Sequence, residues 1–203
     1  KEGEDALKQQ RYADCINALY AILSDSTDDL PPIYSGQDFY TPEALLDTQR
    51  KVFTDSVRRR ADRILAGLPD DGREILAVQQ GVAAQQALES AANTHDFEAI
   101  AAVARNFPHT DAAYDSIITL GRQALIEGRP LAAARYFRRL LDYPAARKRF
   151  GPNLLKAAAA TMCSANRRDN ALQLLVNFAP TYSGGSIEVD GRQISLDRSD
   201  SWA

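Results

Sequence analysis

The chain has 203 residues, of which 45% are hydrophobic and 25% charged, and its formal net charge is -3. These values are typical of a globular protein, and the mild acidity argues against a dedicated nucleic-acid binder, which needs a strongly basic surface. The sequence contains no run of about 18 consecutive apolar residues, so it predicts no membrane insertion by this chain. Gly and Pro are few, at 11 and 9 residues, and this favours helices.

The N-terminal segment, residues 1–72, is expected to form helices around one long loop. Apolar residues recur at helical spacing between residues 4 and 23, and a tight turn near Gln10 and Arg11 separates two helices there. This periodicity is absent from residues 24–41, which are rich in Asp, Ser and Pro. The sequence therefore predicts a loop in that region, and a long one for a compact domain.

A further helix is predicted to follow this loop. Thr41 is a suitable N-cap, and Pro42 fits the first helical position because it has no N–H to leave unpaired. Helical periodicity continues to Leu68. We expect the helix to end at residues 69–72, which read Pro-Asp-Asp-Gly.

Residues 73–183 carry an almost continuous helical signal with regular interruptions. The interruptions fall at residues 93–96, 107–111, 128–130, 143–144, 151–152 and 166–169. Each is expected to follow a helix of about 12 to 18 residues, the length of one arm of a helical hairpin.

Residues 184–203 change character. Apolar residues alternate on both sides of Asp190-Gly191, which is a strong signal for a β-hairpin. The chain also begins at Lys1 without an initiator Met and ends on Asp-Ser-Trp-Ala, so we expect a piece of a longer protein, with residues 184–203 forming the hairpin and a linker to a missing C-terminal domain.

Small and large residues recur within the helical region at a nearly constant interval. The set at residues 120–144 has matching sets 33 residues earlier and 38 residues later. Its small side chains would let two antiparallel helices approach closely. The sets are Ala87, Leu88, Ala91, Ile100, Ala104, Phe107 and Pro108; Leu120, Gly121, Ala124, Gly128, Ala133, Phe137, Leu140 and Pro144; and Leu155, Ala159, Met162, Ala171, Leu175, Phe178 and Pro180. A fourth set could begin with Tyr12, Cys15 and Leu19.

This recurrence resembles the tetratricopeptide pattern. The predicted fold class is all-α, with tetratricopeptide-like helical hairpins stacked in a superhelix over residues 73–183 and a small C-terminal β-hairpin. The alternative is an irregular all-α bundle, because an Ala-rich helical sequence matches a degenerate pattern easily.

Two stretches resemble the N-terminal helical region of exported planctomycete-type proteins that carry a C-terminal β-propeller of pyrroloquinoline-quinone-type repeats, similar to the outer-membrane assembly lipoprotein. The stretches are Arg-Arg-Arg-Ala-Asp-Arg-Ile-Leu-Ala-Gly-Leu-Pro from residue 58 and Gly-Arg-Pro-Leu-Ala-Ala-Ala-Arg-Tyr-Phe-Arg-Arg-Leu-Leu-Asp-Tyr-Pro at 128–144. The resemblance covers most of residues 58–203 and does not extend to residues 24–54. It implies a periplasmic or cell-envelope location and a propeller outside this sequence, and it implies no catalytic residue here.

Single residues with reactive side chains have ordinary structural explanations. His95 and His109 lie between predicted helices, where a capping role or contact with solvent explains them. Cys15 and Cys163 lie on apolar helical stretches, where burial explains both, and their spacing leaves a disulfide between them open.

The sequence contains no motif that pairs a nucleophile with a base, cradles a phosphate or provides metal-ligand spacing. We therefore expect no enzyme activity, no cofactor and no metal site. The alternative, a helical hydrolase or sugar-active domain, would need paired carboxylates, for which Glu74, Glu89 and Glu98 are available.

Charge is distributed unevenly along the chain. Residues 1–48 contain ten acidic and three basic residues, a balance of -7, whereas residues 122–149 contain two acidic and eight basic residues, a balance of +6. Solvated helix faces with some pairing between the two segments would explain this asymmetry. The alternative is a surface that binds an acidic peptide, a phosphate-bearing ligand or an acidic domain of the same protein.

These observations favour a non-enzymatic protein–protein interaction or scaffold domain. The expected partner is a protein or peptide, including the C-terminal domain of the same protein, and nucleic acid is not expected. The predicted binding-face residues are Tyr114, Ile118, Arg122, Arg135, Arg138, Arg139 and Lys156. The alternative is a helical repeat that binds RNA or a phosphate ligand through residues 122–149.

Overall fold

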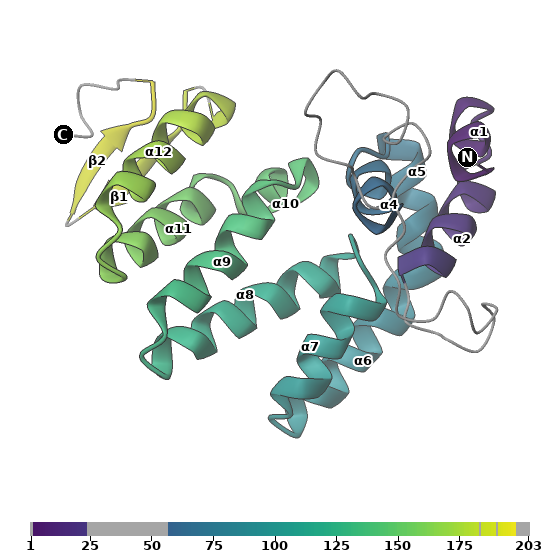
Figure 1. The fold of residues 1–203 in the computed structure, drawn as a ribbon, viewed down its shortest axis with the longest axis horizontal. Helices are drawn as coiled ribbons and strands as arrows, with labels where there is room; N and C mark the ends of the chain where they lie inside the picture. The colour runs from purple at the N-terminus through teal and green to yellow at the C-terminus, as the bar shows by residue number, and fades with distance from the viewer. Residues whose placement is uncertain (1, 24–56, 183, 190, 198–203) are drawn as a thin grey trace, which may run out of the picture. The chain divides into compact units, whose positions relative to one another are not determined.

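The computed structural model describes residues 2–23, 57–182, 184–189 and 191–197, which are mainly helical (Figure 1). The α-helices are α1 (Glu2–Lys8), α2 (Tyr12–Leu23), α4 (Val57–Ala66), α5 (Asp70–Leu76), α6 (Val82–Asn93), α7 (Phe97–Asn106), α8 (Asp111–Ile126), α9 (Pro130–Leu141), α10 (Pro144–Phe150), α11 (Pro152–Ser164) and α12 (Arg168–Phe178). The other elements are the π-helix η2 (Ala77–Gly81), the 3-10 helix η3 (Ala179–Tyr182), and the strands β1 (Ser186–Val189) and β2 (Arg192–Ser195). The predicted helical fold with a small C-terminal β-hairpin is confirmed.

The chain divides into two compact units, Lys1–Ala113 and Tyr114–Ala203, and the division falls inside α8. The segments predicted from sequence end after residues 72 and 183 instead, and those boundaries stay predictions. The predicted loop at residues 24–41 and the predicted helix start at Thr41 lie outside the described residues.

In the first unit, α1, α2, α4 and α5 share one apolar core. Its buried members are Ala6, Cys15, Ile16, Leu19, Tyr20, Ala61, Leu65, Leu68 and Leu76. Full burial of one Leu or Ile side chain contributes roughly 1.5–3 kcal/mol to stability, so this core accounts for the association of the four helices. Two polar contacts supplement it: the Arg58 guanidinium donates to the carbonyl of Leu23, and Arg60 pairs with Glu4 at 2.6 Å.

The helix break expected at residues 69–72 occurs earlier, because α4 ends at Ala66 and α5 already begins at Asp70. Gly72 therefore lies inside a helix. A Cβ at this position would come within 3.3 Å of the Tyr12 ring and 3.2 Å of Leu68 Cδ2. Gly72 thus allows α5 to pack closely against α2, and it does not end a helix.

The turns α1–α2, α6–α7, α8–α9 and α11–α12 share one backbone geometry. The second residue after each helix has a positive φ: Gln10 (58°), His95 (54°), Gly128 (70°) and Asn166 (56°). The next N–H then donates to the carbonyl five residues earlier: Arg11 to Ala6 (2.9 Å), Asp96 to Ala91 (3.0 Å), Arg129 to Ala124 (2.8 Å) and Arg167 to Met162 (2.9 Å). This hydrogen bond is that of the Schellman motif, which satisfies carbonyl groups that the helix end leaves unpaired.

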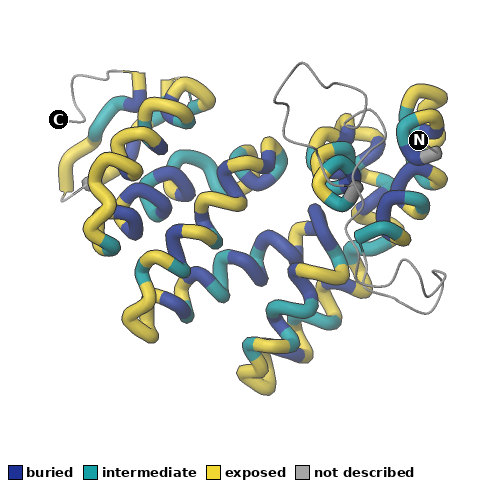
Figure 2. The backbone as a smooth tube through the Cα atoms, viewed as in Figure 1, coloured by how far each residue is buried: buried dark blue, intermediate teal, exposed yellow. Residues whose placement is uncertain are grey.

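In the second unit, α11 packs against both α9 and α12. Gly121 of α8 faces the ring of Phe137 in α9, and a Cβ on Gly121 would come within 2.6 Å of Phe137 Cε1. The expectation that a small residue lets these two helices approach is confirmed at this position. On α9 the recurring residues Ala133, Phe137 and Leu140 are all buried. Figure 2 shows buried and exposed stretches alternating along this helix.

The short helix α10 departs from the predicted helix length. It has seven residues, fewer than the expected 12 to 18, because Pro144 and Gly151 enclose it at its two ends. Proline begins the helix at its first turn, and Gly151, with a φ of 62°, ends it.

The C-terminal hairpin has the predicted position. Ile187 pairs with Ile194 and Val189 with Arg192 across antiparallel strands, and Leu196 N–H donates to Gly185 O at 3.0 Å, which extends the ladder. Ile187 and Leu196 are buried, and β1 contacts α11. The hairpin therefore packs on the helical part of its unit.

Candidate functional site

Helix α9 has a buried apolar side and an exposed basic side. The buried residues are Ala133, Ala134, Phe137, Leu140 and Leu141. The arginines predicted as binding residues, Arg135, Arg138 and Arg139, lie on the opposite side and are exposed. Helical periodicity separates the two sets, because arginine has no place among close-packed apolar side chains.

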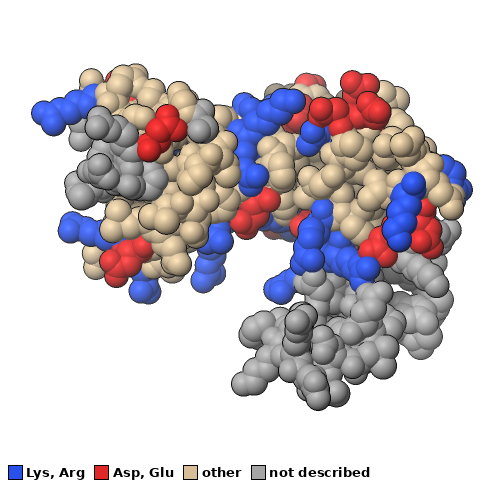
Figure 3. All heavy atoms as spheres, turned by 90° about the horizontal axis from the view of Figure 1, so that it is seen from above, with Lys and Arg blue, Asp and Glu red and all other residues tan. Residues whose placement is uncertain are grey.

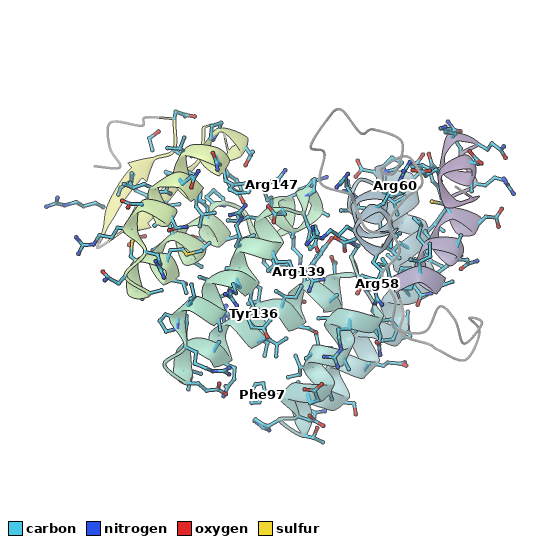
Figure 4. The ribbon with its side chains drawn as sticks, viewed as in Figure 1. Arg58, Arg60, Phe97, Tyr136, Arg139 and Arg147 are labelled. Atoms are coloured by element: carbon cyan, nitrogen blue, oxygen red, sulfur yellow. The ribbon has the colours of Figure 1, made fainter. Side chains whose placement is uncertain are left out.

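Several arginines of α9 and α10 hold the fold together. The guanidinium groups of Arg138 and Arg147 lie 5.8 and 5.9 Å from the centre of the Phe178 ring in α12. Arg147 and Arg139 are labelled in Figure 4. Arg147 also donates to the carbonyl of Leu141 at 2.6 Å. These cation–π contacts and this hydrogen bond join α9, α10 and α12.

Arg139 contacts an aromatic pair. Its Nε donates to the Tyr143 hydroxyl at 3.1 Å, and the Tyr143 ring stacks on the ring of Tyr114, with centres 6.1 Å apart. Tyr114 is only 2% exposed, so the structure places this predicted binding residue among packed side chains. Ile118, one turn further along α8, is half-buried.

The carboxylates of the second unit on α8 to α10 and their connecting turns all have arginine partners. Asp115 pairs with Arg149 at 2.7 Å, Asp142 lies 3.7 Å from Arg138, and Glu127 contacts Arg129. Hydrogen bonds from Gln123 and Arg129 lower the pKa of Glu127, so it is ionised at neutral pH. Each carboxylate of the second unit on α8 to α10 and their turns is therefore already paired with an arginine.

Several cations of this unit have no ionic partner in the described part of the chain, among them Arg167, Arg168 and Arg192 near the C-terminal end. Four others lie on α8 to α11. They are Arg122 on α8, Arg135 on α9, Lys148 on α10 and Lys156 on α11. We call Arg122, Arg135 and Lys156 the unpaired cation set, because all three are also predicted binding residues. Lys156 is half-buried, and the other two are exposed.

The surplus of positive charge belongs to the whole second unit. Residues 114–203 contain thirteen basic and eight acidic residues, a balance of +5, which leaves -8 for residues 1–113. In Figure 3, Lys and Arg side chains project from several places on the surface of α8 to α12. The predicted asymmetry of charge therefore coincides with the division into two units.

His109 differs from the expectation of a capping or solvent-exposed ring. Its ring is buried, and Nε2 lies 2.9 Å from Oδ1 of Asp62 on α4. In the same turn, the Tyr20 hydroxyl donates to the carbonyl of Pro108 at 2.7 Å. These contacts attach the α7–α8 turn to α2 and α4, whereas His95 is exposed as expected.

The two cysteines are free thiols, and no disulfide joins them. Cys15 is buried, as predicted, and burial raises the pKa of its thiol. The prediction of burial is wrong for Cys163, which is exposed. On α11 the buried residues Leu155, Ala159 and Met162 form one side, and Cys163 falls on the other because one residue advances a helix by about 100°.

The three glutamates considered for a hydrolase lie on separate helices and are exposed. Glu89 accepts a hydrogen bond from Gln85, and Glu98 pairs with Arg105, so both bind residues of their own helices. Within the described ranges, no three His, Cys, Asp or Glu side chains gather as metal ligands would. None of the helices described has the length and apolar character needed to span a bilayer.

Comparisons with protein-family models, with curated proteins and with solved structures find no match to this chain.

The sequence did not predict the residues of α12 and η3 that lie next to the arginines of residues 122–149. Phe178 was grouped only as a repeat residue, although it contacts two arginines that precede it by more than thirty positions. The Tyr182 hydroxyl is buried without a hydrogen-bond partner among the described atoms, and this burial raises its pKa while nearby Arg147 opposes the shift. No sequence pattern signals such contacts, because they depend on how α10 and α12 fold back on α9.

Proposed function

We propose that this chain is a non-enzymatic protein-interaction domain, in which tetratricopeptide-like hairpins present a basic surface to an acidic protein segment. The hairpins are α6–α7, α8–α9 and α11–α12, which coincide with the three sets of recurring residues. Their turn residues His95, Gly128 and Asn166 are 33 and 38 residues apart, the same offsets as the sets. Direct packing of α9 on α11 supports stacking of the α8–α9 and α11–α12 hairpins on each other, as successive repeats stack in a superhelix.

The observation that carries the binding proposal is the unpaired cation set. Arg122, Arg135 and Lys156 come from three helices of one unit, and the neighbouring carboxylates already have partners. A surplus of cations is complementary to a partner that supplies carboxylates, and such charges raise association rates and specificity more than affinity.

The partner class follows from the same chemistry. An acidic peptide or an acidic domain of the same protein fits this surface, and the resemblance offers a C-terminal propeller domain in a periplasmic or cell-envelope protein as one example. RNA phosphates would also attract these cations, but the chain lacks the strong overall basicity that sustains such binding at physiological salt.

The test uses the 203-residue chain and a fluorescent decaglutamate peptide, with anisotropy measured at about 50 and about 300 mM salt. Replacing Arg122, Arg135 and Lys156 by Gln is expected to weaken binding about tenfold at the lower salt and to reduce its salt dependence. Arg138 and Arg139 are unsuitable for this test because Arg138 contacts Phe178 and Arg139 contacts Tyr143.

The matched control replaces Arg167, Arg168 and Arg192 by Gln, which removes the same charge from exposed positions of the same unit. This control is expected to bind nearly as well as the original chain. Equal weakening in both variants would mean that net charge alone attracts the peptide, and the proposed surface would be rejected. Tighter binding of a single-stranded RNA than of the peptide would assign the surface to nucleic acid instead.

A further inference from the structure

The last turn of α8 and the first turn of α9 carry large apolar side chains in solvent. Leu125 is 40% exposed, Ile126 80% and Leu131 40%. The intervening residues are also mostly exposed (Figure 2), and nothing lies within 4 Å of the position a Cβ on Gly128 would occupy. We call Leu125, Ile126 and Leu131 the apolar tip.

The backbone of this turn does not require apolar residues. The α6–α7 and α11–α12 turns have the same Schellman hydrogen bonds. The residues equivalent to Ile126 are Asn93 and Ser164, and those equivalent to Leu131 are Glu98 and Asp169. Because two turns of the same geometry carry polar residues at these positions, the apolar tip needs an explanation other than folding of the turn.

Two arginines flank the apolar tip along its two helices. Arg122 lies one turn before Leu125 and Ile126 on α8, and Arg135 lies one turn after Leu131 on α9. Both are exposed and have no carboxylate partner in the described ranges. The acidic residue at the turn, Glu127, is neutralised by Arg129, so the local balance is positive.

We propose that the apolar tip enters the headgroup region of an anionic lipid bilayer, a peripheral contact distinct from the membrane-spanning insertion that the sequence does not predict. Exposed apolar side chains at the end of a hairpin can enter the headgroup region, and the flanking arginines would bind lipid phosphates. A protruding turn suits a soft planar surface better than a peptide, which needs a groove to bury its side chains. Three side chains and two cations give weak, reversible attachment, as for other peripheral contacts.

The direct test is sedimentation of the 203-residue chain with vesicles of phosphatidylcholine containing about 30% phosphatidylglycerol. We expect binding to these vesicles, and much weaker binding to phosphatidylcholine alone or at about 300 mM salt. The double variant Ile126→Ser, Leu131→Ser should lower the partition coefficient about tenfold. Both residues are exposed, so circular dichroism should show an unchanged fold.

The matched control is Leu172→Ser, Val176→Ser, which removes two exposed apolar side chains from α12 of the same unit. It is expected to partition like the original chain. Absence of sedimentation with the anionic vesicles at about 50 mM salt would overturn the proposal, as would equal losses in both double variants.

A second measurement reports insertion itself. Trp202 is the single tryptophan, so Ile126→Trp in a Trp202→Phe background places one fluorophore at the apolar tip. Anionic vesicles should shift its emission to shorter wavelength, and an unchanged spectrum would contradict insertion. The decaglutamate assay on the double variant Ile126→Ser, Leu131→Ser distinguishes lipid binding by the apolar tip from peptide binding by the unpaired cation set. This variant should bind the peptide as well as the original chain does.

Discussion

Gly121 of α8 lies against the ring of Phe137 in α9, so closely that a Cβ would come within 2.6 Å of the ring. The pair fixes the separation of two helices in the second unit, since Phe137 is itself buried. A methyl group at this position has to displace an aromatic ring that close packing holds in place.

Gly121→Ala should therefore destabilise the protein by about 1–3 kcal/mol, which is typical of overpacking. The measurement is the midpoint of urea unfolding, followed by circular dichroism. Gly81→Ala serves as the control, because a Cβ there would meet only Ala77 at 3.9 Å and Ala favours helix. Equal stability of Gly121→Ala and the original chain would mean that α8 and α9 are further apart than described.

The shared turn geometry predicts opposite effects for two substitutions. Gly128 has a φ of 70°, so Gly128→Ala should cost about 1 kcal/mol of stability, because a Cβ is disfavoured in the left-handed region. Asn166, with a φ of 56°, already bears that cost, so Asn166→Gly should be neutral or stabilising by a few tenths of a kcal/mol. Thermal unfolding of the two variants tests this, and changes of the same sign would contradict it.

The hydrogen bond from the Tyr20 hydroxyl to Pro108 O spans 88 positions of the chain. Tyr20→Phe should destabilise the first unit by about 1–2 kcal/mol, because it leaves a carbonyl without that donor. Tyr12→Phe is the matched control, since Tyr12 packs on the same core. Chemical denaturation distinguishes the two, and an equal effect of both variants would show that loss of the hydroxyl, not of this bond, matters.

The contact between Arg138 and Phe178 should appear as a coupling energy. In a double-mutant cycle with Arg138→Gln and Phe178→Leu, we expect about 0.5–1 kcal/mol of interaction, the usual value of a partly exposed cation–π pair. Arg135→Gln with Phe178→Leu is the control cycle, because Arg135 has no such contact. A coupling energy near zero for Arg138 would show that its contact with Phe178 does not stabilise the protein.

The two thiols should differ in their reactivity toward a thiol reagent. Ellman's reagent should modify exposed Cys163 rapidly and buried Cys15 only after unfolding, and a native chain with no reactive thiol would instead indicate a disulfide.

Burial raises the pKa of Cys15 above 9.0, so the folded protein holds the thiol proton more tightly than the unfolded chain does. Stability should therefore fall as pH rises above 9.0, and Cys15→Ala should weaken that dependence.

The sequence alone determined the local structure well. Prolines at the first turn of α9, α10 and α11, and the interruptions at residues 93–96, 128–130 and 166–169, marked helix ends correctly because capping and φ preferences act within a few residues. The Asp190-Gly191 signal located the hairpin for the same reason.

Which side of a helix meets its neighbours was decided only by the tertiary structure. Cys163 is exposed and Tyr114 buried, against expectation, because burial depends on the helices that pack alongside and not on the apolar character of the residue. The same holds for the arginines: identical guanidinium groups either stack on Phe178 or remain without an ionic partner. Long-range packing assigned those roles, since the free energy of each contact comes from groups that are distant in sequence and adjacent only after folding.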